Sequence, residues 1–172
     1  MDHKVYLSSP YEVSRANQKW KVQAQNALQR VDDRFTTVDP CPGSCLEYDF
    51  AEEMKEKGDW LGFYSFCANI VEGDFSMLNG SRGMIAYLPK NAVTFGTTDE
   101  ISFSLQYHIP VVLVMPEGVQ HISRWLWGRL GPQRLFDNIE EAATVLAKRI
   151  LVANGEDING EIYNPSWQRT SQ

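Results

Sequence analysis

The chain has 172 residues, of which 43% are hydrophobic and 22% are charged, and its formal net charge is −6. A chain of this length and composition is typical of one globular domain with a single hydrophobic core. The acidic balance disfavours binding to a DNA or RNA polymer, because attraction to backbone phosphates supplies most of that affinity. Local donor groups could still hold a single nucleotide.

The N-terminal stretch Lys4–Pro10 is too short, and too interrupted by serines, to be a signal peptide. No apolar run approaches the length that spans a bilayer, so no membrane association is expected. The cysteines are Cys41, Cys45 and Cys67, and their odd number argues against a disulfide framework. No second pair of Cys or His follows Cys41 and Cys45 at ligand spacing, so no metal site is predicted. These features predict a cytoplasmic protein.

The first part of the chain predicts a strand, a helix and a second strand. The first strand is Val5–Pro10, with Pro10 suited to the first turn of the following helix. The second strand is Arg34–Val38, which the segment Asp39–Gly43 ends. The helix between them carries apolar residues at a spacing close to 3.6, namely Val13, Trp20, Ala24, Leu28 and Val31.

The middle of the chain is rich in aromatic residues and predicts two helices, a strand and a further helix. The two helices are Glu47–Glu56 and Leu61–Leu78, and the strand is Gly83–Pro89. After a loop, a helix opens at Gly96, with Thr97 or Thr98 as its cap and acidic residues in its first turn.

The last part predicts a central strand over Ile109–Met115, because this run is continuously apolar and β-branched. A helical segment at Gly118–Arg129, a short edge strand at Arg134–Phe136 and an amphipathic helix at Ile139–Val152 follow. We expect one domain over residues 1–153 and a turn-rich surface tail over 154–172.

Strands that alternate with helices predict an α/β fold of the Rossmann-like, flavodoxin-like kind. We expect a mostly parallel sheet of about five strands with helices on both faces. Such sheets bind ligands at the carboxyl ends of their strands, near the point where the strand order reverses. That rule singles out Ser8 and Ser9, then Asp39, then the segment Thr94–Glu100.

Glu100 is the first candidate for chemistry. It lies about one turn into a helix that follows a strand, so its carboxylate would point back toward the strand ends, where it could attack carbon. The alternative is an acidic residue that complements the helix dipole.

Four segments in chain order resemble the nucleoside 2-deoxyribosyltransferases and their N-glycosidase relatives. They are Asn69–Asp74, Gly83–Tyr87, Gly96–Glu100 and Ile109–Val114. The family pattern is an aspartate, an apolar strand, a loop, a glycine-containing turn that leads to a glutamate, and a second apolar strand. The separation of the aspartate and the glutamate also matches, and the resemblance covers most of the chain before Gly128.

The resemblance implies a role for each of three residues. Glu100 corresponds to the nucleophile that forms a covalent glycosyl intermediate, and Asp74 to the carboxylate that handles the proton of the departing base. Tyr6 corresponds to a tyrosine that orients the nucleophile, although it could equally be a core aromatic. Two such carboxylates suffice for glycosidic chemistry, so no cofactor and no metal are expected.

Two positions bear on the choice of substrate. Where transferases have an aspartate for the 5′-hydroxyl group, this chain has Thr94, and a hydroxyl group can donate to a phosphate that a carboxylate would repel. The turn that contains Gly96 and Thr97 is similar to the corresponding turn of nucleoside monophosphate hydrolases. Ser123 corresponds to a serine that reaches the phosphate across a dimer interface in those enzymes; otherwise it is a helix residue that faces solvent.

Ser8 and Ser9 stand where the family often has glycines, and with the following helix start they could form an anion site. Several aromatic residues could stack on a base, although core positions are the default for each of them. They are Tyr11, Trp60, Phe63 and Tyr64. Trp125 and Trp127 are candidates for a subunit interface.

The sequence therefore predicts an N-glycosidase that hydrolyses the base–sugar bond of a nucleoside or deoxynucleoside 5′-monophosphate, with a pyrimidine base favoured. The protein would be a homodimer in which Ser123 reaches the neighbouring site. Base exchange between 2′-deoxynucleosides is the alternative within the same family. A nucleotide-binding sensor without turnover is the alternative outside it.

Overall fold

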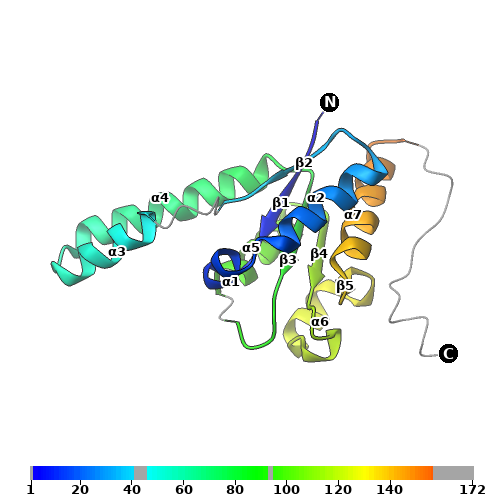
Figure 1. The fold of residues 1–172 in the computed structure, drawn as a ribbon. Coiled ribbons are helices and arrows are strands. Elements are labelled where there is room, and N and C mark those ends of the chain that lie inside the picture. The colour runs from blue at the N-terminus through cyan, green and yellow to red at the C-terminus, as the bar shows by residue number, and fades with distance from the viewer. Residues whose placement is uncertain (1, 41–45, 93–94, 157–172) are drawn as a thin grey trace.

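A computed structural model of the chain describes residues 2–40, 46–92 and 95–156. Within these ranges five parallel strands form one sheet in the order β2-β1-β3-β4-β5 (Figure 1). The strands are β1 (His3–Ser8), β2 (Phe35–Val38), β3 (Gly83–Tyr87), β4 (Val111–Val114) and β5 (Leu135–Phe136). The predicted α/β fold with a parallel sheet is therefore confirmed.

The strand order reverses at β1. From β1 the sheet extends to β2 on one side, and to β3, β4 and β5 on the other. In the register between β1 and β3, Tyr6 lies beside Met84 and Ser8 beside Ala86. The crevice at the carboxyl ends of β1 and β3 is thus the place where sheets of this order bind ligands.

Helices cover both faces of the sheet, as the alternation of elements predicts. The described helices are α1 (Tyr11–Ala16), α2 (Lys19–Val31), α3 (Leu46–Glu56), α4 (Trp60–Asn79), α5 (Phe95–Gln106), α6 (Arg124–Leu130) and α7 (Ile139–Ala153). Two short 3₁₀ helices, η1 (Val119–His121) and η2 (Pro132–Arg134), join the later elements.

Side chains of β1 alternate between two cores. Val5 and Leu7 belong to the core under α2 and α7, whereas Tyr6 belongs to the core under α5 and α6. The same alternation continues in β3, where Ile85 lies in the first core and Met84 in the second. Because both faces are buried, the strands are apolar throughout, as expected of a parallel sheet.

Three predicted helix boundaries are wrong. The helix expected across Val13 to Val31 is interrupted at Asn17, whose backbone is extended and whose side chain accepts a hydrogen bond from the Lys19 amide over 3.0 Å. The helix that contains Glu100 begins at Phe95, so Thr97 and Thr98 lie inside it and do not cap it. The helical stretch expected over Gly118–Arg129 is divided, because Ile122 and Ser123 are extended between η1 and α6.

Helices α3 and α4 form an arm that projects beyond the sheet (Figure 1). Asp59 caps the start of α4 by accepting a hydrogen bond from the Gly62 amide over 2.9 Å. Large apolar side chains are exposed along the two helices of this arm, and they are Phe50, Trp60, Leu61, Tyr64 and Val71. The default of a core position was therefore wrong for Trp60 and Tyr64, because the part of α4 that carries them extends past the sheet.

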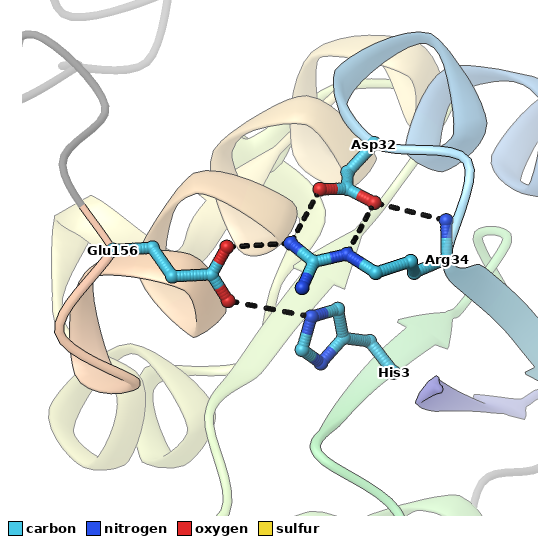
Figure 2. A network of polar contacts seen from close by, with 4 residues as sticks. All are labelled: His3, Asp32, Arg34 and Glu156. Atoms are coloured by element: carbon cyan, nitrogen blue, oxygen red, sulfur yellow. Dashed lines mark hydrogen bonds and ion pairs between the residues drawn. The ribbon is translucent and has the colours of Figure 1, made fainter. Parts of the chain in front are cut away.

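A charged network closes the amino end of β1 and β2, at the edge opposite Ser8. Arg34 donates from Nε and Nη2 to the two carboxylate oxygens of Asp32, over 2.9 and 2.6 Å, and Nη2 also contacts Glu156 (Figure 2). Buried His3 lies beside this network, with Nε2 3.6 Å from Glu156 Oε1. The network fixes the end of the described chain against the start of the sheet.

Among residues 2–40, 46–92 and 95–156, no helix is both long enough and apolar enough to cross a membrane.

Candidate active site

Glu100 lies between α5 and the carboxyl end of β1. Its Oε1 accepts a hydrogen bond from the Tyr6 hydroxyl group over 2.6 Å, and its Oε2 accepts one from the Ser8 hydroxyl group. Tyr6 and Ser8 are both fully buried. Two donors from one strand thus hold the carboxylate of Glu100 in a fixed orientation.

The pleat of β1 explains why both donors reach the same carboxylate. Side chains two residues apart on a strand point to the same face, so Tyr6 and Ser8 both point toward α5. Ile101, the neighbour of Glu100, is fully buried in the same core as Tyr6 and anchors α5 against that face. Packing of α5 therefore brings Glu100 to the two hydroxyl groups.

Burial and hydrogen bonding act on Glu100 in opposite directions. Burial raises the pKa of the Glu100 carboxyl group above its ordinary value, the hydrogen bonds from Ser8 and Tyr6 oppose that rise, and the nearby charge of Asp99 adds to it. The net direction is upward. Each carboxylate oxygen keeps a lone pair that no hydroxyl group occupies, so an ionised Glu100 remains a nucleophile.

Tyr6 stays protonated under all ordinary conditions. Burial raises the pKa of its phenol far above the usual range, and the negative charge and hydrogen bond of Glu100 raise it further. Tyr6 is therefore a permanent donor to Glu100 and not a general base.

Asp74 and Asp39 lie close enough to this centre for their charges to act on Tyr6, since both raise the pKa of the phenol. Asp74 is half-buried near the end of α4, one turn before Leu78, which packs in the same core as Tyr6. Residues four apart share a helix face, so Asp74 faces the sheet. The structure thus brings Asp74 into the electrostatic neighbourhood of Tyr6, which donates to Glu100.

Asp39 lies just after β2 and accepts a hydrogen bond from Lys21 Nζ over 2.6 Å. The Lys21 side chain is almost entirely buried, so this pair is a fixed part of the wall. In this geometry the carboxylate of Asp39 holds Lys21, whereas the sequence suggested a substrate contact.

The two serines at the carboxyl end of β1, Ser8 in the strand and Ser9 after it, have different partners. Ser8 was predicted to bind substrate, but its hydroxyl group is bonded to Glu100. The hydroxyl group of Ser9 lies 2.6 Å from that of buried Ser14 in α1. Ser8 is thus a supporting residue of the carboxylate, and Ser9 belongs to the turn into α1.

The turn before Glu100 is described in part. Thr94 lies outside the described residues. Gly96 is exposed in the first turn of α5, and Thr97 is buried there.

Ser123 occupies the N-cap of α6, where its hydroxyl oxygen accepts a hydrogen bond from the Leu126 amide over 3.3 Å. It also lines a pocket of about 280 Å³ together with Thr98, Lys90, His121 and Trp125. Thr98 comes from the same helix as Glu100. Among the contacts of the described residues, none joins Ser123 to Glu100 within one subunit.

Sequence reasoning missed two supporting residues, Ser14 and Lys21, and the role of a third, Ser8. The signal for Ser8 was present, because it stands two positions after Tyr6 and so shares its face of the strand. Lys21 carries no comparable signal, since its partner Asp39 becomes a neighbour only when α2 packs on the sheet, whereas Ser14 meets Ser9 locally across the turn into α1.

The arrangement joins a buried carboxylate with fixed orientation, two hydroxyl donors, and two further carboxylates whose charges act on the Tyr6 donor. Carboxylates in different surroundings can divide acid and nucleophile roles between them. A site of this kind can attack an electrophilic carbon and protonate a leaving group.

The chain was also compared with known proteins. No protein-family model matches its sequence, and no curated protein matches it.

Proposed function

We propose that this protein is an N-glycosidase that hydrolyses the base–sugar bond of a nucleoside or deoxynucleoside 5′-monophosphate, with a pyrimidine base favoured. The observation that carries the proposal is the carboxylate of Glu100 held by Tyr6 and Ser8 at the switch point of the sheet. The resemblance of the motifs around Asp74 and Glu100 to the nucleoside 2-deoxyribosyltransferase superfamily supports it.

In the proposed first step, Glu100 attacks C1′ of the sugar and forms an ester bond. The C1′–N bond to the base breaks, its electron pair goes to the base nitrogen, and protonated Asp74 supplies a proton there. The hydrogen bonds of Tyr6 and Ser8 keep Glu100 from rotating away from C1′. Burial makes the ionised carboxylate more basic, which suits a nucleophile.

In the second step, water attacks C1′ of the ester and gives its proton to Asp74. The C1′–O bond to Glu100 breaks, and the carboxylate leaves with the electron pair. The products are the free base and the sugar 5-phosphate, and both carboxyl groups return to their starting states. This is the double displacement of retaining glycosidases.

The phosphate group of the substrate would meet hydroxyl donors at Thr94 and Ser123, with the Gly96–Thr97 turn between Thr94 and Glu100. Lys90 and His121 line the same pocket as Ser123 and add positive or polar character to it. An odd number of cysteines supports a reducing, cytoplasmic compartment.

The protein would act as a homodimer in which Ser123 reaches the neighbouring site. The exposed apolar side chains of the α3–α4 arm support self-association, because a twofold interface brings the same patch against itself. A stable interface needs about 800 Å² from each partner, and large apolar residues on two helices supply an apolar centre for it. Trp125, two residues after Ser123 on α6, is a separate exposed aromatic residue away from this arm.

The proposal is tested by incubating the protein with pyrimidine and purine nucleosides and their 5′-monophosphates, and measuring the free base by chromatography. Release of base from monophosphates alone supports it. Base exchange confined to free 2′-deoxynucleosides would instead favour a deoxyribosyltransferase, because water and an incoming base compete for the same ester. Thermal stabilisation by a nucleotide without release of base would indicate a binding protein without turnover.

A further inference from the structure

A second pocket lies away from Glu100, at the edge where the strands begin. It has a volume of about 580 Å³ and is lined by Arg134, Arg149, His108 and Gln133, among others. His108 lies just before β4 and Arg134 just before β5, whereas Glu100 bonds to the carboxyl end of β1. Arg149 comes from α7, which runs back along the sheet toward the amino ends of the strands (Figure 1).

Hydrogen bonds to backbone carbonyl groups hold both guanidinium groups in place. Arg149 Nη2 donates to the carbonyl oxygen of Gln133 over 2.7 Å, and Arg134 Nη1 donates to that of Leu130 over 2.9 Å. Because Gln133 directly precedes Arg134, the first bond brings the two arginine side chains together. Each guanidinium group has five N–H donors, so most of them remain for a ligand.

Among the described residues, no acidic side chain lines this pocket to balance its positive charge. Within the described part of the chain, no ion pair involves Arg134 or Arg149. Burial lowers the pKa of the Arg149 guanidinium, and the neighbouring charge of Arg134 lowers it further. Two like charges are thus held side by side in a protein whose net charge is −6.

We propose that this pocket binds a small molecule that carries a phosphate group. The planar fork of each guanidinium group can donate paired hydrogen bonds to two oxygens of a phosphate group, and the His108 imidazole can add a third donor. A dianionic phosphate balances two arginines better than one carboxylate does. The volume suits inorganic phosphate or a sugar phosphate. This site is separate from the one around Glu100 and does not rest on the proposed function.

The test is calorimetric titration of the full chain with inorganic phosphate and with ribose 5-phosphate, using ribose as the uncharged control, at a constant 150 mM NaCl. The variants are Arg134→Gln, Arg149→Gln and the double variant. Each of them is also made in the Ser123→Ala background, where the phosphate contact proposed near Glu100 is removed, so that the remaining binding reports on this pocket. Arg30→Gln is the matched control, because it also removes one arginine charge but at an exposed ion pair with Glu140.

We expect Arg30→Gln to bind phosphate as wild type does. Each pocket variant should weaken binding roughly tenfold or more, since hydrogen bonds between charged groups are strong. Binding of ribose 5-phosphate but not of inorganic phosphate would identify the sugar ester as the ligand. Equal binding by the double variant, or no binding of either phosphate by wild type, would overturn the proposal.

Thermal unfolding gives a second measurement that does not depend on the calorimetry. Removal of one of two neighbouring positive charges should leave the Tm of the ligand-free Arg149→Gln protein unchanged or higher, while the rise in Tm that phosphate causes is lost. Should the double variant not fold, Arg149→Lys replaces it. That variant keeps the charge but lacks the paired donors, and it should bind phosphate more weakly than wild type; undiminished binding would count against the site.

Discussion

The Tyr6 hydroxyl group donates a hydrogen bond to Oε1 of Glu100 over 2.6 Å, and the two residues are 94 positions apart in the chain. The bond joins the sheet to α5 at the point where the strand order reverses. It also stabilises the ionised form of a carboxyl group whose burial favours the neutral form. The same contact therefore fixes both the position and the charge of Glu100.

Glu100→Gln should abolish turnover while the fold is kept. Glutamine has the same shape and can still accept the Tyr6 hydrogen bond, but it cannot form the ester, so kcat should fall by about three orders of magnitude or more. Release of base from the best monophosphate measures the effect. Glu72→Gln, an exposed carboxylate on α4, is the control, and retained activity in Glu100→Gln would remove the proposed mechanism.

The same variant has a second consequence, for stability. The folded state raises the pKa of Glu100, so the folded protein binds a proton more tightly there than the unfolded chain does, and stability falls as pH rises past the ordinary glutamate pKa. Glu100→Gln should therefore raise the Tm at pH 7, and the gain should shrink below about pH 4. A lower Tm at pH 7 would mean that the carboxylate stabilises the fold.

Tyr6→Phe should move the acidic limb of the pH–rate profile to higher pH. In the wild type, the hydrogen bond from Tyr6 lowers the pKa of Glu100. In Tyr6→Phe this bond is absent, so the carboxyl group stays protonated, and inactive, to higher pH. Tyr87→Phe is the matched control, since Tyr87 is a buried strand tyrosine on the other face of the sheet, where it stacks on Trp20. An unchanged limb in Tyr6→Phe would show that Tyr6 only fills the core.

The sequence predicted the fold, and it predicted which residues gather around the candidate Glu100 better than it predicted their hydrogen-bond partners. Apolar runs and helical periodicity are local signals, so each strand and most helices were found near their actual places. Glu100 and Asp74 were found by motif, and the structure places both near Tyr6. Ser8 was assigned to the substrate because it ends the strand, although its position two residues after Tyr6 places its hydroxyl group on the face of β1 that meets Glu100.

Other features depend on packing that no local pattern encodes. The break at Asn17 is an exception, because it is marked locally by the bond between the Asn17 side chain and the Lys19 amide, although the helical spacing of the apolar residues on either side conceals it. The exposure of Trp60 and Tyr64 follows from the direction in which α4 leaves the sheet, which composition cannot reveal. Arg134 and Arg149 meet only because α7 folds back over the end of η2.

Asp32→Asn should lower the Tm at neutral pH but not in acid. The hydrogen bonds and charge of Arg34 hold the pKa of Asp32 well below its ordinary value. The Asp32 carboxylate therefore stabilises the fold fully at a pH above the ordinary aspartate pKa. This stabilisation is lost as the pH falls toward the lowered pKa of Asp32 in the folded protein. Thermal unfolding from pH 7 to pH 2 should show the two proteins converging. Asp33→Asn, at an exposed neighbouring position, is the control, and a pH-independent difference would contradict this account.

Leu61→Lys on the α3–α4 arm should shift the protein from dimer to monomer. Leu61 is 76% exposed, so the substitution has no core to disturb, but it would place a charge among the exposed apolar side chains of the proposed interface. Light scattering coupled to size-exclusion chromatography gives the mass. Val152→Lys, which changes an exposed apolar residue on α7, should stay dimeric; a monomeric wild type would reject the dimer itself.

Mixing two impaired variants tests whether Ser123 acts across subunits. In a heterodimer of Glu100→Gln and Ser123→Ala, a site shared between chains would pair the intact Glu100 of one subunit with the intact Ser123 of the other, and one of the two sites would regain activity. If Ser123 serves its own subunit, both sites keep one altered residue and activity does not rise.

The variants are unfolded together, refolded at equal concentrations and assayed for base release. Recovery to about a quarter of wild-type activity is expected, because random pairing makes half of the dimers mixed and each mixed dimer holds one intact site. The same mixture made in the Leu61→Lys background should show no recovery, since subunits that do not associate cannot share a site.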